Sequence, residues 1–138
     1  MPNGTAMRTL NLSVFLTRAP DVEGQWVGHC LDLDVVSQGD SMRHAYEMTR
    51  EAVELLILDD LNAGREPTLR SAPREEWEAA TRVVHSANPK LYTLSELFAN
   101  EGHMHYALAP LMLGFEAVTS MHPAALQEIE APLRAQAA

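Results

Sequence analysis

A regular alternation of aliphatic residues near the start of the chain is the feature that most constrains its fold. Leu10, Leu12, Val14 and Leu16 occupy every second position of residues 9–17. Because successive side chains of a strand point to opposite faces, this period of two predicts a half-buried β-strand. An isolated strand is not stable in water, so the segment predicts a sheet that further parts of the chain must complete.

Two further strands are predicted directly after the first one. Pro20 and Gly24 mark a turn segment, and residues 25–31 follow it as a second strand. The short connection implies that this strand is antiparallel to the first. Residues 35–38 form a short third strand, which Gly39 ends. The three segments predict an antiparallel meander.

A long helix is predicted to follow the third strand. Asp40 and Ser41 are good N-cap residues, and the helical pattern continues to about Asn62, ahead of Gly64. At 1.5 Å per residue the helix would be about 30 Å long, enough to cover a small sheet. The face expected to pack on the sheet consists of Ala45, Met48, Ala52, Leu55 and Leu56.

The second half of the chain carries weaker signals. Pro73 predicts the start of a helix that ends near Asn88, and residues 93–96 match a capping box for a short helix. Residues 103–118 fit either a strand or an interrupted apolar segment, because Pro110 breaks the alternation. A last helix is predicted after Pro123. The fold class is therefore α+β, with a domain over residues 1–69 and a mostly helical C-terminal extension, possibly with one added strand, over residues 70–138.

Composition excludes several classes of protein. The 138 residues are 46% hydrophobic and 21% charged, as in ordinary globular proteins. Ten basic and nineteen acidic residues give a net charge of −9, which disfavours unspecific binding to nucleic acid and favours a basic partner or plain solubility. The single Cys30 rules out an intramolecular disulfide and is expected in the core. With no leader and no apolar stretch of about 20 residues, we expect a cytoplasmic protein without a membrane span.

Several motifs in the first half occur together in a recognisable order. Gly39 allows the chain to turn sharply, a cap residue follows, and small residues let the helix lie close to the sheet. The motifs are, in chain order, Gly24-x-Trp26-Val27, Asp32-Leu33, Ser37-Gln38-Gly39-Asp40-Ser41, and Ala45-Tyr46 with Ala52 seven residues after Ala45. In this order and spacing, residues from about 9 to 67 resemble the HicB-like antitoxin domain.

The resemblance implies a fold and a function. The fold is a partial version of the double-stranded-RNA-binding domain, with one helix packed on an antiparallel sheet. The function is that of a bacterial type II antitoxin, which covers the active surface of a small basic HicA-like ribonuclease toxin. Asp34-Val35 departs from the family's Pro-Gly, and Met42-Arg43-His44 from its glutamate. Antitoxins that repress their own operon add a DNA-binding module, but the basic residues of the second half are too scattered for one: Arg70, Arg74, Arg82, Lys90 and Arg134.

Two other functions remain open. The chain is alternatively a stand-alone oligomeric module of the same fold without a toxin partner. Homo-oligomers are expected in either case, because the edge strands of a short sheet need a cover. The third alternative is a metal-binding protein that uses His103 and His105, which a strand would present on one face.

The residues that could contact a basic partner are acidic. They lie around the third strand and on the predicted helix: Asp32, Asp34, Asp40, Glu47 and Glu51. Aspartates also form turns and cap helices, and from residue type alone that interpretation is the stronger for the three aspartates. For Glu47 and Glu51, a solvated helix face is the stronger interpretation and a docking face the second. The sequence contains no glycine-rich phosphate loop, nucleophile elbow or HExxH motif. We therefore expect neither enzyme activity nor a cofactor.

Overall fold

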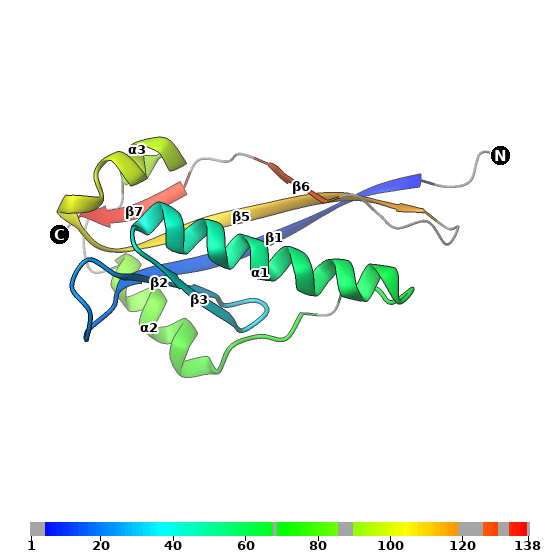
Figure 1. Cartoon of the computed structure of the whole chain (residues 1–138), viewed down its shortest axis with the longest axis horizontal. Coiled ribbons are helices and arrows are strands. Elements are labelled where there is room, and N and C mark those ends of the chain that lie inside the picture. The colour runs from blue at the N-terminus through cyan, green and yellow to red at the C-terminus, as the bar shows by residue number, and fades with distance from the viewer. Residues whose placement is uncertain (1–4, 68, 86–89, 119–125, 130–132, 138) are drawn as a thin grey trace.

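The computed structural model describes residues 5–67, 69–85, 90–118, 126–129 and 133–137, and these form one antiparallel sheet with helices on both faces (Figure 1). The elements are, in chain order, β1 (Thr5–Arg18), β2 (Trp26–Cys30), β3 (Val35–Gly39), α1 (Met42–Asn62), α2 (Arg74–His85), β4 (Lys90–Tyr92), α3 (Leu94–Ala99), a 3₁₀ turn η1 (Glu101–His103), β5 (Met104–Val118), β6 (Leu126–Ile129) and β7 (Leu133–Ala137).

Strands β1 and β5 form the centre of the sheet. They pair antiparallel without a register break from Thr5 opposite Val118 to Thr17 opposite Tyr106. The predicted strand at residues 9–17 is confirmed as the larger part of β1. Its alternating aliphatic residues lie opposite small or aliphatic residues of β5, and Leu10 is partly buried beside the core. The fully buried members of these pairs share one core: Leu12, Val14, Leu16, Ala107, Ala109 and Leu111.

The predicted meander is confirmed and is one half of a wider sheet. The strand order is β3-β2-β1-β5-β7-β4, with β6 paired to β5 beside β7. Strands β1, β2 and β3 are consecutive neighbours and antiparallel, and Cys30 lies opposite both Val14 and Val35. Segments from the two halves of the chain thus share the same sheet.

Strand β5 passes straight through Pro110, the residue that made the sequence ambiguous here. The backbone N–H of Ser13 donates to Asp32, and its backbone carbonyl accepts from the Leu31 N–H. Both backbone polar groups of Ser13 therefore point away from β5. Pro110 lies opposite Ser13, and its ring nitrogen therefore faces the other edge of β5. On that edge β7 pairs as far as Leu108, and β6 pairs only from Met112 onward. Among the described residues, no strand pairs with β5 at Pro110 on that edge, so the missing N–H of proline breaks no described ladder hydrogen bond.

Helix α1 covers one face of the sheet, along β2, β3 and β1 (Figure 1). The helix bounds match the prediction, but the predicted packing face is only partly correct: Ala45 lies in the core and Leu56 packs against it. Of the predicted residues only Ala45 is fully buried, and Met48 and Leu55 are exposed. The residues that face the sheet keep helical spacing but include polar side chains: Met42, Ala45, Tyr46, Thr49, Val53, Ile57 and Asp60. The Thr49 hydroxyl donates to the Ala45 carbonyl, which allows it to be buried.

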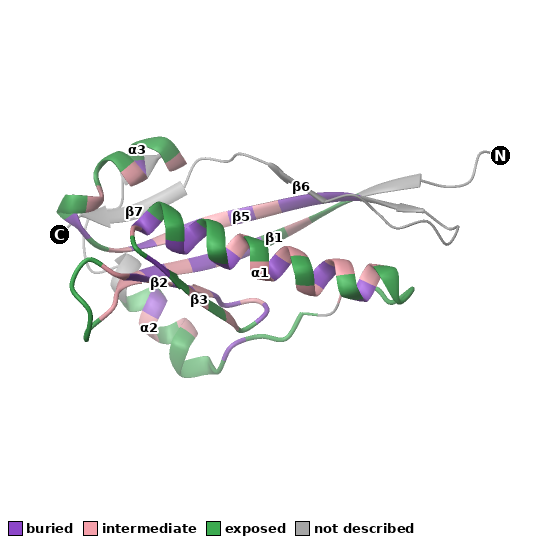
Figure 2. Cartoon of the chain, viewed as in Figure 1, coloured by how far each residue is buried: buried purple, intermediate pink, exposed green. Residues whose placement is uncertain are grey.

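Helix α2 lies against the opposite face (Figure 2). Its buried Ala80 and half-buried Trp77 pack with Leu31, Phe15 and Leu108 in a second, smaller cluster. Phe15 belongs to this cluster because the odd-numbered residues of β1 face away from α1. The sheet is therefore covered on both sides where β1, β2 and β5 meet.

The α+β class is confirmed, but the mostly helical extension is wrong. The helix after Pro73 and the capped helix after Thr93 are present as α2 and α3, and Thr93 accepts from the Glu96 N–H at 3.1 Å. The predicted last helix is instead β6 and β7, because pairing with β5 outweighs helix propensity in short segments. Within the described residues, no helix is long and apolar enough to span a bilayer.

The junction between β3 and α1 is tightly packed around Gly39. A Cβ at this position would overlap the Ala45 nitrogen and lie 2.6 Å from the His44 carbonyl carbon. Two residues later the Ser41 hydroxyl accepts from the His44 N–H at 3.0 Å and caps the helix. The motif that carries the family resemblance thus fixes where α1 begins on the sheet.

We predict that Gly39→Ala lowers the free energy of unfolding by roughly 1–3 kcal/mol, the usual cost of forcing an extra methyl into a packed site. Gly102→Ala is the matched control, because a Cβ there meets nothing within 4 Å. Urea unfolding of both variants measures the difference. Equal stability of the two variants would contradict the packing described.

Candidate functional site

The five predicted acidic residues do not form a single site. Asp32 and Asp34 belong to the β2–β3 turn, Asp40 precedes α1, and Glu47 and Glu51 are exposed on α1. The aspartates lie at turns and helix ends, whereas the glutamates lie on an exposed helix face.

Asp32 has a structural role in the sheet. The β1–β2 ladder would give the Ser13 N–H to the Leu31 carbonyl, but the Asp32 carboxylate accepts it at 2.5 Å. The Leu31 carbonyl accepts instead from the Ala72 N–H at 2.7 Å. Because the Asp32 side chain takes the Ser13 N–H, the Leu31 carbonyl can accept a hydrogen bond from the segment that leads into α2.

The surroundings of Asp32 and Cys30 disfavour negative charge. Burial raises the pKa of the Asp32 carboxyl, against the lowering effect of backbone N–H groups including that of Ser13. Burial, with a contribution from nearby Asp32, also raises the pKa of the Cys30 thiol to about 11. Cys30 is fully buried, which confirms its predicted place in the core. A protonated, enclosed thiol is a poor nucleophile.

Asp34 and Asp40 make local contacts at the two ends of β3. Asp34 has a φ of 53°, a left-handed conformation that aspartate tolerates, and its carboxylate lies 2.8 Å from His29 Nε2. His29, the partner of Asp34, was not among the predicted site residues. Its place near the end of β2, beside the β2–β3 turn, follows from the short hairpin. The backbone N–H of Asp40 donates to Nδ1 of His44 at 3.0 Å. The three aspartates thus mainly shape turns.

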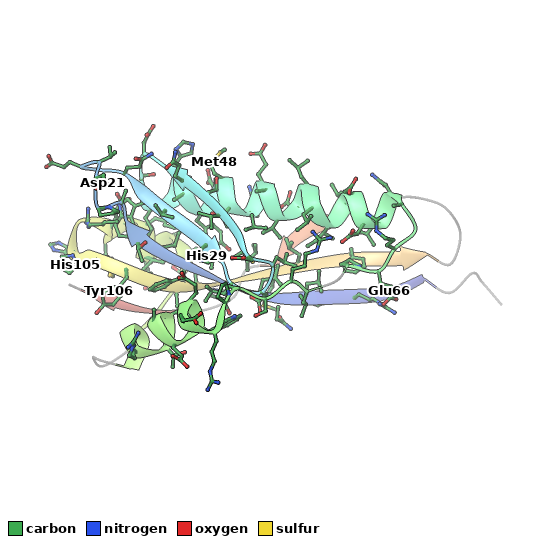
Figure 3. The ribbon with its side chains drawn as sticks, turned by 90° about the horizontal axis from the view of Figure 1, so that it is seen from below. Asp21, His29, Met48, Glu66, His105 and Tyr106 are labelled. Carbon is green, nitrogen blue, oxygen red and sulfur yellow. The ribbon has the colours of Figure 1, made fainter. Side chains whose placement is uncertain are left out.

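Glu47 and Glu51 lie on the side of α1 that faces away from the sheet. We call this side the outer face of α1 and define it by six exposed residues: His44, Glu47, Met48, Glu51, Leu55 and Asp59. Figure 2 shows green, exposed positions recurring along the helix between buried and intermediate ones, and Figure 3 shows Met48 on this side. In the part of the chain that the structure describes, no ion pair engages Glu47 or Glu51.

The two histidines suggested as metal ligands are not on one strand. His103 ends the 3₁₀ turn η1, and β5 begins only at Met104. His105 is exposed where the β5–β7 register shifts, at the end of the sheet seen in Figure 3. The predicted shared strand face is therefore wrong, because the chain turns before it enters the strand. Among the described residues, no group of three or more histidine, cysteine, aspartate or glutamate side chains is placed to hold a metal ion.

We predict that Asp32→Ala lowers the free energy of unfolding by about 1–3 kcal/mol, because the Ser13 N–H loses its acceptor in a half-buried place. Asp21→Ala is the control, since Asp21 is exposed in the β1–β2 loop (Figure 3). Thermal or urea unfolding measures both. A loss no larger than that of the control would show that Asp32 is not needed to join the turn to β1.

We also predict that the folded protein loses stability as the pH rises from 9 to 11 because of Cys30. In this window the unfolded thiol, with a pKa near 9.0, gives up its proton while the folded thiol, with a pKa of about 11, keeps it. Stability falls with pH wherever the folded state binds more protons.

The measurement is the difference in unfolding free energy between the natural chain and Cys30→Ala at several pH values. The advantage of the natural chain shrinks between pH 9 and pH 11 if the thiol is the cause. A difference that does not vary with pH would rule out this role of the thiol.

Comparison with known proteins assigns no family to the chain. No family model, no curated protein and no solved structure matches it. What the molecule does is therefore inferred from its own residues and their arrangement.

Proposed function

We propose that the chain is a HicB-like antitoxin that neutralises a small basic HicA-like ribonuclease toxin by covering its active surface. The observation that carries this proposal is the outer face of α1. It exposes Glu47 and Glu51, which no ion pair among the described residues engages, on a protein with a net charge of −9. A surface of this charge attracts a basic protein and speeds its association.

The motif residues support the proposal through their positions. Gly39, Ser41 and Ala45 lie where β3 meets the first turn of α1, in the order on which the family resemblance rests. The β1-β2-β3-α1 arrangement is also the one that the resemblance implies. These features concern the fold, and the acidic face adds the chemistry that a basic partner would recognise.

Neutralisation by occlusion requires no catalytic group in the antitoxin. A ribonuclease holds the phosphates of RNA with lysine and arginine side chains. Carboxylates on a complementary surface pair with the same side chains and exclude the substrate. The acidic face of α1 competes with RNA in this way, and the competition weakens as salt screens both charges.

We predict that the chain inhibits RNA cleavage by its toxin, with one binding site of the chain occupied for each toxin molecule inhibited. The experiment isolates proteins bound to the tagged full chain from its own cells and tests each small basic protein for RNA cleavage. Addition of purified chain then abolishes cleavage by that protein, and expression of the chain relieves the growth arrest that the protein causes.

The double variant Glu47→Gln, Glu51→Gln weakens inhibition, whereas Glu75→Gln, Glu76→Gln on exposed α2 positions does not. The proposal fails if no bound basic protein cleaves RNA, or if the chain leaves cleavage unchanged.

A second candidate is the stand-alone oligomer, which the open edge of β1 favours. On the β2 side, no described strand pairs with residues 5–12. The segment after α1 passes beside this edge, where Glu66 forms an exposed ion pair with Arg8 at 2.6 Å (Figure 3). An unpaired strand edge presents backbone N–H and C=O groups that a strand of another copy can bind. A stable oligomer of the purified chain that inhibits no ribonuclease would favour this candidate.

A further inference from the structure

We propose that the outer face of α1 is the docking surface for a basic amphipathic helix of the partner protein. This inference rests on the proposed function for the identity of the partner, and it adds which element of the partner binds and where. It follows from apolar side chains, acidic side chains and helical spacing on the same face.

Two apolar side chains of α1 are not used by the core. Met48 and Leu55 are 37% and 63% exposed, whereas Val53 and Ile57 of the same helix are buried. They are seven residues apart, which places them on the same side of the helix two turns from each other. The distance between them along the axis is about 10.5 Å, from a rise of about 1.5 Å per residue.

The charges beside these residues are acidic, and the basic side chains of α1 are engaged elsewhere. Glu47 and Glu51 lie one turn apart on the outer face, both on the same side of Met48. Arg43 instead lies over the ring of Phe98, 5.1 Å from its centroid, and Arg50 lies 3.7 Å from Glu54. The outer face therefore combines a short apolar stripe with net negative charge.

An amphipathic helix matches this combination. Apolar residues at positions i and i+7 of a second helix are also about 10.5 Å apart, so they can contact Met48 and Leu55 together. Lysine or arginine residues beside that stripe reach the carboxylates of Glu47 and Glu51. A polar basic segment without the apolar stripe would leave Met48 and Leu55 uncovered.

A second copy of this chain fits the surface less well. Two outer faces packed together would bring the Glu47 and Glu51 carboxylates of both copies into the same interface. Like charges brought together at an interface disfavour the complex. The charge of the face therefore favours a basic partner over self-association.

The test uses a synthetic peptide with leucine on one helical face and lysine on the flanks, together with a scrambled peptide of equal composition. Fluorescence anisotropy measures binding of both to the full chain. The amphipathic peptide binds, and the scrambled peptide binds at least tenfold more weakly. Leu55→Lys in the protein weakens binding at least tenfold, and so does Glu51→Lys. Both positions are exposed, and thermal unfolding verifies that the variants are folded.

The matched controls change equally exposed residues in other places. Leu69→Lys alters a leucine that is 58% exposed after α1, and Glu75→Lys alters an exposed glutamate of α2. Both bind the peptide as the natural chain does. The inference is overturned if Leu69→Lys and Leu55→Lys lose peptide binding equally, or if the scrambled peptide binds as well as the amphipathic one. It is also overturned if the natural chain forms a dimer that Leu55→Lys abolishes.

Failure of the inference can be distinguished from failure of the proposed function. If Leu55→Lys inhibits the ribonuclease as well as the natural chain does, the docking surface is wrong and the function stands. If no ribonuclease is inhibited but Leu55→Lys still loses the peptide, the function is wrong and the docking surface stands.

Discussion

The pairing of β1 with β5 is the contact on which the rest of the structure depends. It joins residues about one hundred positions apart and continues from Thr5 to Thr17 without a shift. The even-numbered residues of β1 build the core beneath α1, and Phe15 on the other side builds the smaller core beneath α2. Residues of both strands contribute to the core beneath α1 and to the smaller core beneath α2. The ladder therefore makes one sheet from the two halves of the chain.

The sequence predicted the elements whose signals are local. Alternation in residues 9–17, the short hairpins and the cap at Ser41 gave β1, β2, β3 and α1 with nearly correct bounds. Strand β5 was not predicted because Pro110 fits a strand only where its nitrogen faces no pairing strand, and the described parts of β6 and β7 pair on either side of it. The packing face of α1 escaped because buried Thr49 and Asp60 broke the apolar pattern. Both errors come from contacts between distant residues.

The five acidic candidate residues fall into two groups that their residue types do not distinguish. Asp32, Asp34 and Asp40 look alike in the sequence, yet Asp32 completes a sheet and Asp34 lies against His29. Glu47 and Glu51 differ from them because α1 presents both away from the sheet. Met48 and Leu55 were predicted to be core residues because they are apolar. They form an apolar stripe that folding leaves uncovered.

Pro110 also limits what can happen at the outer edge of β5. A long strand with a bare edge is a template on which strands of other molecules can add and propagate. If β6 and β7 came away from β5, an incoming strand could form hydrogen bonds on either side of residue 110 but not across it. The proline that the fold tolerates at no cost thus acts as a built-in interruption against aggregation along the longest strand of the sheet.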